Sequence, residues 1–197
     1  MPSVMIDPGH GPGNANMGPS GYREYEGMWK LSNYLKSALE RSGIRAYLTR
    51  EEWEAPSLPE RGRAAAGHDV FLSQHSNAAG EALAGQLRGT EVYYSVRQPE
   101  NYAFAADLSF MVARTLGIPN NGAKTRASAS DPTRDYYAVM RAAVDVGCPH
   151  VLFSEIAYHD NAEDEALLLD NENLRRVAEA QAEVICRFLG VAYIWPE

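Results

Sequence analysis

Short apolar runs alternate along this chain with longer stretches in which apolar residues recur at helical spacing. The short runs predict β-strands, and the periodic stretches predict amphipathic helices. Strands that alternate with helices are typical of α/β folds, in which helices cross over between parallel strands. The pattern therefore predicts a single three-layer α/β domain, with a central, mostly parallel twisted sheet of about six strands flanked by helices.

The boundaries of these elements follow from where each pattern begins and ends. Strands are predicted at residues 4–6, 44–49, 69–73, 90–96 and 150–154. Helices are predicted around residues 28–39, 57–67, 102–116, 136–144 and 174–188. The strand at 90–96 alternates polar and apolar residues, so we expect it to be half-exposed, toward the sheet edge. Residues 117–134 combine Pro, Asn, Gly and Ser with little periodicity, which predicts a long surface loop.

Composition limits the classes of function. The chain has 197 residues and a formal net charge of -8, with 18 basic against 26 acidic residues. That balance argues against nucleic-acid binding and gives no attraction to anionic membranes. The sequence shows no apolar stretch of the roughly 18 residues that a membrane span needs, and no signal peptide at its start. We therefore expect synthesis in the cytoplasm, one domain at residues 1–191, and the start of a linker or C-terminal tail at residues 192–197.

Three of the apolar runs end in residues that can carry chemistry. One leads to His10, another to His75 and the last to Glu155. Because the carboxyl ends of parallel strands lie along one edge of a sheet, we expect these side chains to meet there. Two imidazoles and a carboxylate suggest zinc, which in hydrolases commonly has three protein ligands of N or O type plus water. The first helix offers a further ligand, because Glu24 and Glu26 both lie in its opening turn.

Four motifs follow one another along the chain. They are Asp-Pro-Gly-His-Gly around His10, Gly-Tyr-x-Glu ending at Glu24, Ser-x-His-x-Asn-Ala around His75, and Glu155 after an apolar run. In this order they resemble the zinc-dependent N-acetylmuramoyl-L-alanine amidases of the Amidase_3 family. The resemblance extends over nearly the whole chain.

The resemblance implies a hydrolase that cleaves the amide bond between N-acetylmuramic acid and L-alanine in peptidoglycan. It implies one Zn²⁺ per chain, with His10, Glu24 and His75 as ligands, and it matches Glu155 to the family's catalytic glutamate. Glu26 is then a solvated carboxylate, which the helix dipole favours.

Three departures from the family pattern bear on substrate preference. Gln74 stands at a usually apolar position, Asn121 stands where an arginine commonly precedes the glycine, and Ile-Ala-Tyr follows Glu155 in place of the usual Gly-Phe ending. None of them removes a matched site residue.

Several polar residues have two open interpretations. Lys124, Arg126 and Arg134 form the one local basic cluster; they either bind stem-peptide carboxylates or belong to a solvated loop. Asn77 hydrogen-bonds either its own loop or the substrate. Asp7 either orients His10, as metal-bound histidines usually require, or simply forms the turn.

The remaining histidines and the cysteines suggest no further site. His68, His150 and His159 are expected to be structural or solvated, although His159 lies close enough to Glu155 in the sequence to contact substrate. Cys148 and Cys186 lack a second thiol at metal-ligand spacing, so we expect buried free thiols.

Two other functions stay open. A zinc peptidase that cuts within the stem peptide would use the same metal chemistry, and an inactive wall-binding module would share the fold. An amidase without a signal peptide fits two settings: the catalytic domain of a phage endolysin, with a cell-wall-binding domain beyond the chain end, or an autolysin that lyses a cell or mother cell. In both it acts on the cell wall after release, and we expect a monomer with peptidoglycan as its partner.

Overall fold

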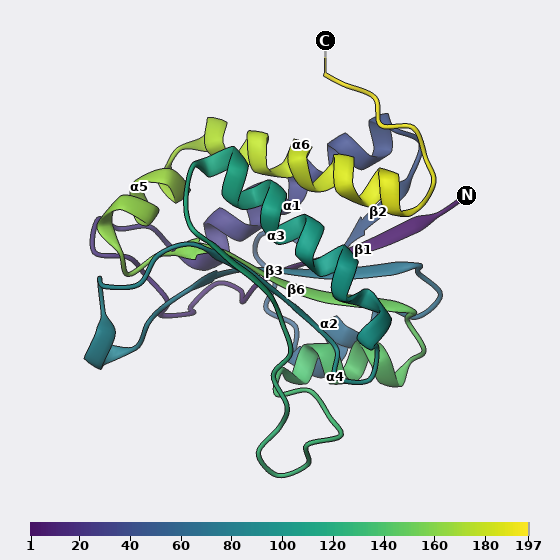
Figure 1. Cartoon of the computed structure of the whole chain (residues 1–197), viewed down its shortest axis with the longest axis horizontal. Helices are drawn as coiled ribbons and strands as arrows, with labels where there is room; N and C mark the ends of the chain where they lie inside the picture. The colour runs from purple at the N-terminus through teal and green to yellow at the C-terminus, as the bar shows by residue number, and fades with distance from the viewer. Residues whose placement is uncertain (197) are drawn as a thin grey trace.

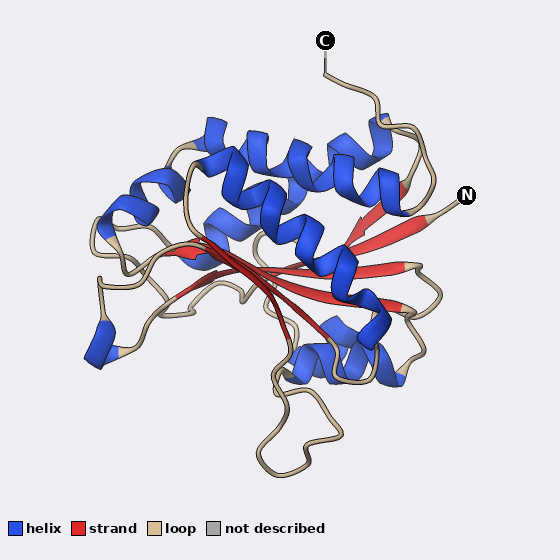
Figure 2. Ribbon diagram, viewed as in Figure 1, coloured by secondary structure: helices blue, strands red, loops and turns tan. Residues whose placement is uncertain are grey.

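The computed structural model describes residues 1–196 and has a six-stranded sheet at its centre (Figures 1 and 2). The strands are β1 (Ser3–Pro8), β2 (Arg45–Leu48), β3 (Val70–Asn77), β4 (Thr90–Tyr94), β5 (Asn120–Lys124) and β6 (His150–Tyr158). They lie in the order β2-β1-β3-β6-β4-β5. The first four strands in this order are parallel, whereas β4 pairs antiparallel with β6 and parallel with β5. The predicted mostly parallel α/β sheet is confirmed.

Helices cover the two faces of the sheet unequally (Figures 1 and 2). One face is covered by α1 (Glu24–Arg41), α3 (Tyr102–Leu116) and α6 (Asn171–Phe188), with α5 (Ala162–Leu169) packed against α6. The opposite face carries the shorter α2 (Leu58–Arg63) and α4 (Ala138–Asp145). We call these the long-helix face and the short-helix face. Two short 3-10 helices, Glu81–Leu83 and Pro99–Asn101, lie in the connections.

The alternation of side chains along the strands decides which face the polar residues occupy. Met5, Phe71 and Phe153 belong to the apolar cluster that also contains α4, on the short-helix face. His75 and Glu155 follow Phe71 and Phe153 at even spacing in β3 and β6, so their side chains lie on this same face. The sheet thus directs His75 and Glu155 toward the face that carries the shorter helices.

The prediction was wrong at residues 117–134, where β5 takes the place of a continuous loop. The strand sequence, Asn-Asn-Gly-Ala-Lys, contains none of the β-branched or aromatic residues that favour strands. Gly122 adopts φ +82°, and β5 pairs with β4 alone at the sheet edge. Backbone pairing with β4 therefore specifies this strand, and β4 itself lies second from the edge.

The predicted end of the last strand was also wrong. β6 continues to Tyr158, so Glu155 lies inside the strand rather than after it. The helix α5 was not predicted; its N-terminus is capped by the side chain of Asn161, which accepts hydrogen bonds from two backbone N–H groups.

Other expectations agree with the structure. The helix predicted at 102–116 is α3, and Cys148 and Cys186 are buried and free. Among residues 1–196, we find no helix with both the length and the apolar character to span a bilayer.

The predicted tail folds back onto the domain. Residues 192–196 have no regular secondary structure. Arg41 Nε donates a hydrogen bond to Ile194 O at 2.9 Å, and Ile194 N donates to Ser42 Oγ at 3.1 Å. The final position of the predicted tail, residue 197, lies outside the described residues.

Candidate metal centre

The turn after β1 presents His10. Its φ of +59° is a left-handed conformation that residues other than glycine rarely adopt. Gly9 N donates to Gln74 O at 2.8 Å, and a Cβ on Gly9 would lie 2.5 Å from that oxygen. The turn therefore requires glycine here in order to pack against the end of β3. This packing brings the rings of His10 and His75 to a centroid distance of 4.9 Å.

Glu24 is the first residue of α1, and it is 1% exposed. Its Oε1 accepts hydrogen bonds from His75 Nδ1 and from the backbone N–H of Ser76, both at 3.0 Å. Its Oε2 accepts one from Asn16 Nδ2 at 2.7 Å and lies 3.2 Å from His10 Nε2. Burial opposes ionisation, but hydrogen bonds from the two imidazoles outweigh it and hold the pKa of Glu24 below its usual range. Glu24 is therefore an ionised carboxylate that touches both histidines.

His75 is buried, and its ring stacks on Phe153 with a centroid distance of 4.2 Å. Burial lowers the pKa of His75 even though Glu24 opposes the shift, so the imidazole is neutral near pH 7. The neutral form is the one that binds metals. His75 Nε2 is buried and has no hydrogen-bond partner among residues 1–196. Such orphaned atoms are uncommon in folded proteins, and each one calls for an explanation such as a bound ion.

These three residues fit a divalent metal ion. One donor atom each of His10, Glu24 and His75 lies within 4.8 Å of the others. Tetrahedral zinc with N and O ligands at about 2.0–2.1 Å separates those ligands by about 3.3 Å. The 3.2 Å between His10 Nε2 and Glu24 Oε2 is close to that separation, and His75 offers its orphaned Nε2 as the third donor. Glu26, the alternative carboxylate, pairs with Arg23 at the surface.

Glu155 lies opposite His75 in the register of β3 and β6. It is buried, and its Oε2 has no hydrogen-bond partner among the described residues. Burial raises the pKa of Glu155 well above its usual range; the negative charges of Glu24 and Glu91 add to this shift, and Arg126 opposes it. A carboxyl group with a raised pKa can take up and release a proton near neutral pH.

A cavity of about 260 Å³ joins these groups on the short-helix face. It lies where α2 begins at Leu58 and where α4 begins at Ala138. His10 is 27% exposed, so the cavity reaches solvent on that side. Its other lining residues include Asn16, Asn77, Tyr137, Phe153 and His159.

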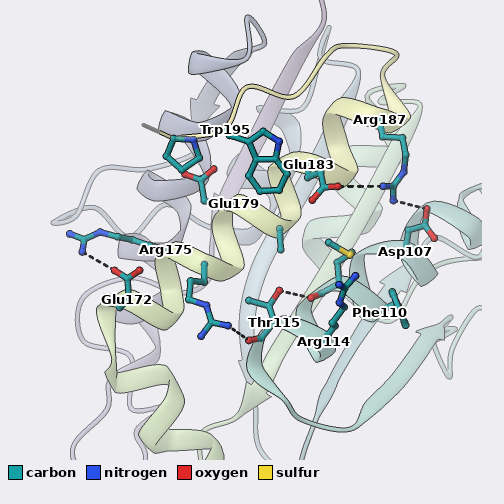
Figure 3. A pocket seen from close by; sticks show the side chains of 14 residues that line it. Asp107, Phe110, Arg114, Thr115, Glu172, Arg175, Glu179, Glu183, Arg187 and Trp195 are labelled. Atoms are coloured by element: carbon teal, nitrogen blue, oxygen red, sulfur yellow. Dashed lines mark hydrogen bonds and ion pairs between the residues drawn. The ribbon is translucent and has the colours of Figure 1, made fainter.

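A larger groove of about 990 Å³ lies on the long-helix face, between α3 and α6. Figure 3 shows its charged side chains directed toward one another: Arg187 pairs with Asp107 and Arg175 pairs with Glu172. Trp195 contributes to the wall. The cluster that could hold a metal ion, as found within residues 1–196, lies in the smaller cavity and not here.

Asn77 and Lys124 meet at the buried carboxylate of Glu91. Asn77 Nδ2 donates to Glu91 Oε1 at 3.1 Å, and Lys124 Nζ pairs with Glu91 Oε2. Glu91 lies directly opposite Glu155 in the antiparallel register of β4 and β6. The two predicted substrate-binding residues therefore lie close to the candidate metal centre, and in this structure the side chain of each is bonded to Glu91.

The rest of the predicted basic cluster is divided. The guanidinium of Arg126 lies 3.7 Å above the ring centroid of Tyr136, and its charge acts on the carboxyl group of Glu155. Arg134 pairs with Asp145 at the end of α4, away from the cavity. The three basic residues do not form one cluster.

Asp7 has a role that neither sequence interpretation foresaw. Arg61 donates two hydrogen bonds of 2.7 Å to its carboxylate, and Thr49 and Ser73 donate two more. Burial alone would raise the pKa of Asp7, but the charge and hydrogen bonds of Arg61 lower it. Among the described residues, Asp7 thus anchors α2 to β1 and does not orient His10.

Sequence reasoning missed several residues of the site. Asn16 and Tyr137 line the cavity but lie in loops without a recognisable motif. Glu91, which is opposite Glu155, is a charged residue inside a predicted strand, and that was a usable signal. His159 lines the cavity, whereas His68 and His150 bond to residues elsewhere, as expected.

Comparisons with known proteins agree with this geometry. The sequence model of Amidase_3, the N-acetylmuramoyl-L-alanine amidase family, matches residues 4–187. The chain belongs to this family. The match includes the candidate ligands and Glu155.

Individual relatives of this amidase-family chain are distant in sequence but similar in fold. N-acetylmuramoyl-L-alanine amidase LytC of Bacillus subtilis is 29% identical over 84% of this chain and 31% of its own length. The endolysin of Bacillus phage SPP1 is 28% identical over 95% of this chain and 66% of its own length. The catalytic domain of CwlV, an amidase from Bacillus (Paenibacillus) polymyxa, gives a TM-score of 0.81 at 26% identity and covers 98% of this chain and 100% of that domain. The chain thus spans under a third of LytC and about two thirds of the endolysin.

Proposed function

We propose that this protein is a zinc-dependent N-acetylmuramoyl-L-alanine amidase. It hydrolyses the amide bond between the lactyl group of N-acetylmuramic acid and L-alanine in peptidoglycan. The observation that carries the proposal is the convergence of the His10, Glu24 and His75 donor atoms near Glu155, whose Oε2 has no hydrogen-bond partner in the described part of the chain. Membership of the amidase family supports the same substrate.

Each site residue has a defined task in this reaction. His10, Glu24 and His75 would hold the zinc ion, with Glu24 ionised and His75 neutral. When bound, zinc supplies Lewis-acid chemistry, since it acidifies water and polarises the amide carbonyl. Glu155 Oε2 accepts the proton that water loses as it adds to the carbonyl carbon. It then passes this proton to the nitrogen of L-alanine as the C–N bond breaks, leaving a lactyl carboxylate and a free amine.

Lys124 and Arg126 supply a binding site for the stem peptide. Arg126 is exposed and stacked on Tyr136, so its guanidinium is held in a defined orientation at the surface. Lys124 is 42% exposed beside Glu91. We assign these two residues, with Asn77, to the stem peptide and its carboxylates, and we leave Arg134 out because it lies elsewhere.

The proposal is tested by mass spectrometry of muropeptides after digestion of purified peptidoglycan. An amidase releases peptides with a free L-alanine amine and leaves intact glycan, whereas a peptidase acting within the stem peptide yields truncated stems. The products should disappear with a zinc chelator and return when Zn²⁺ is added. An absence of products at every metal concentration would favour a module that binds the wall without cutting it.

We further propose that the protein acts on the cell wall after release from the cytoplasm. A phage endolysin and a bacterial amidase are both among its relatives, and either setting fits the reaction.

A further inference from the structure

A β-bulge interrupts the regular pairing of β3 with β6, the two strands that carry His75 and Glu155. His75 is opposite Glu155, but Asn77 is opposite Tyr158, so the single residue Ser76 of β3 faces two residues of β6. A bulge interrupts the regular ladder of backbone hydrogen bonds. The polar groups of the Ser76 backbone therefore need other partners.

Both of these backbone groups find partners at the candidate metal centre. The N–H of Ser76 donates to Glu24 Oε1 at 3.0 Å. The carbonyl oxygen of Ser76 lies 3.1 Å from His159 Nδ1, and the Ser76 hydroxyl lies 2.9 Å from the same nitrogen. His159 N donates to Asn77 O at 2.8 Å, so this residue holds the bulged segment at two successive carbonyls.

We assign the ring hydrogen of His159 to Nδ1, because the Ser76 carbonyl oxygen beside it can only accept a hydrogen bond. The Ser76 hydroxyl, 2.9 Å from the same nitrogen, is then a second acceptor. His159 is 4% exposed, which keeps water from replacing this hydrogen bond. The imidazole of His159 thus replaces the backbone N–H that would have donated to the Ser76 carbonyl oxygen in a regular ladder.

We propose that His159 is a positioning residue for Glu24, acting through the Ser76 backbone. By fixing the Ser76 carbonyl it fixes the orientation of the bulged segment, and with it the N–H that holds one oxygen of the metal-binding carboxylate. Groups that orient a metal ligand change metal affinity by about 10–100-fold when they are removed. This inference rests on the proposed metal centre, and it makes zinc affinity depend on a residue that is not itself a ligand.

Zinc affinity of the purified chain, measured by competition with a chromophoric chelator, tests the inference without substrate. His159→Phe keeps a ring but removes the donor, and we expect about tenfold or more weaker Zn²⁺ binding. His159→Asn retains an N–H donor near the Nδ1 position and should restore binding to within a few-fold of the wild type. His159→Leu serves as a second variant without a donor, in case the Phe variant does not fold. Circular dichroism and thermal unfolding of the metal-free proteins establish folding.

His150 offers a matched control. It begins β6 at the opposite end from the cavity, and its Nδ1 is 2.7 Å from Asn101 Oδ1. His150→Phe should leave zinc affinity unchanged. Ser76→Ala should also bind zinc normally, because it keeps the backbone carbonyl.

Each contrary outcome identifies what fails. Wild-type affinity in folded His159→Phe, or an equal loss in His150→Phe, would overturn the positioning role. An equal loss in Ser76→Ala would assign the effect to the hydroxyl and overturn the route through the carbonyl. A wild-type protein that takes up no Zn²⁺ would instead refute the metal centre itself, together with the inference.

Discussion

The groove between α3 and α6 and the cavity on the short-helix face differ in what their polar atoms contact. In the groove between α3 and α6, of about 990 Å³, charged side chains form exposed pairs such as Arg187 with Asp107. In the cavity on the short-helix face, of about 260 Å³, His75 Nε2 and Glu155 Oε2 are buried and have no hydrogen-bond partner within residues 1–196. The smaller cavity is the one equipped for chemistry, because uncompensated burial of polar groups is costly and is kept where it serves a function. Volume alone would have selected the wrong region.

Among the substitutions that test this contrast, Glu155→Gln should have the largest effect on the reaction rate. We expect kcat to fall about 10³-fold, since general acid–base catalysis contributes about 10²–10⁴-fold, while Zn²⁺ affinity and folding persist. Release of peptides with a free L-alanine amine measures the rate. Near-normal turnover by this variant would remove Glu155 from the reaction.

Asp7→Asn tests a buried carboxylate that is fully paired, in contrast to Glu155. The change leaves Arg61 buried without its counter-ion, so the free energy of unfolding should fall by about 3 kcal/mol in urea titrations at pH 7. Asp145→Asn, which disrupts half-exposed ion pairs with Arg97 and Arg134, is the control and should cost less than about 1 kcal/mol. An equal loss of unfolding free energy in the two variants would contradict the expectation that the buried ion pair contributes more than the exposed ones.

The same pair makes a pH-dependent contribution. The pKa of Asp7 is lower in the folded protein than its unfolded value of 3.8, so its stabilisation is present above pH 3.8 and is lost as the pH falls below it. The stability difference between the wild type and Asp7→Asn should therefore shrink in that acidic range. A difference that stays constant from pH 7 down to pH 2 would contradict this assignment.

Arg126→Ala should affect substrate binding more than the chemical step. We expect KM on peptidoglycan fragments to rise about tenfold, equivalent to about 1.4 kcal/mol, with a smaller change in kcat. Arg134→Ala is matched in charge but lies away from the cavity, and its KM should stay at the wild-type value. An equal rise of KM in the two variants would show that the effect comes from the overall charge of the protein and not from the position of Arg126.

Glu183→Gln, in the larger groove, should have the smallest effect. Glu183 lies 4.0 Å from Arg187 in an exposed pair, and such pairs contribute about 0–1 kcal/mol. Peptidoglycan hydrolysis should stay within twofold of the wild type. A loss comparable to that of Arg126→Ala would show that the groove takes part in the reaction.

The sequence was informative where local pattern and topology coincide. His10, His75 and Glu155 could be placed at one sheet edge because apolar runs precede them and parallel strands end together. β5 could not be predicted, because Asn-Asn-Gly-Ala-Lys becomes a strand only by pairing with β4.

The residues that surround the candidate ligands could not be predicted from local sequence patterns, for a related reason. Glu91 comes to lie opposite Glu155 through the antiparallel pairing of β4 with β6, and His159 lines the cavity next to the bulge between β3 and β6. Arg61 meets Asp7 across 54 positions of sequence. Contacts of this kind depend on the assembled sheet, which no single segment encodes.

The thin helical cover on the short-helix face has a consequence for how a polymer is attacked. An enclosed tunnel must be threaded from a chain end, whereas a recess with an open side admits a branch while the main chain stays outside. In the proposed reaction, a glycan strand can lie across the mouth of the cavity and present its peptides one at a time. Cleavage can then begin in the interior of an intact meshwork, without waiting for another enzyme to create free ends.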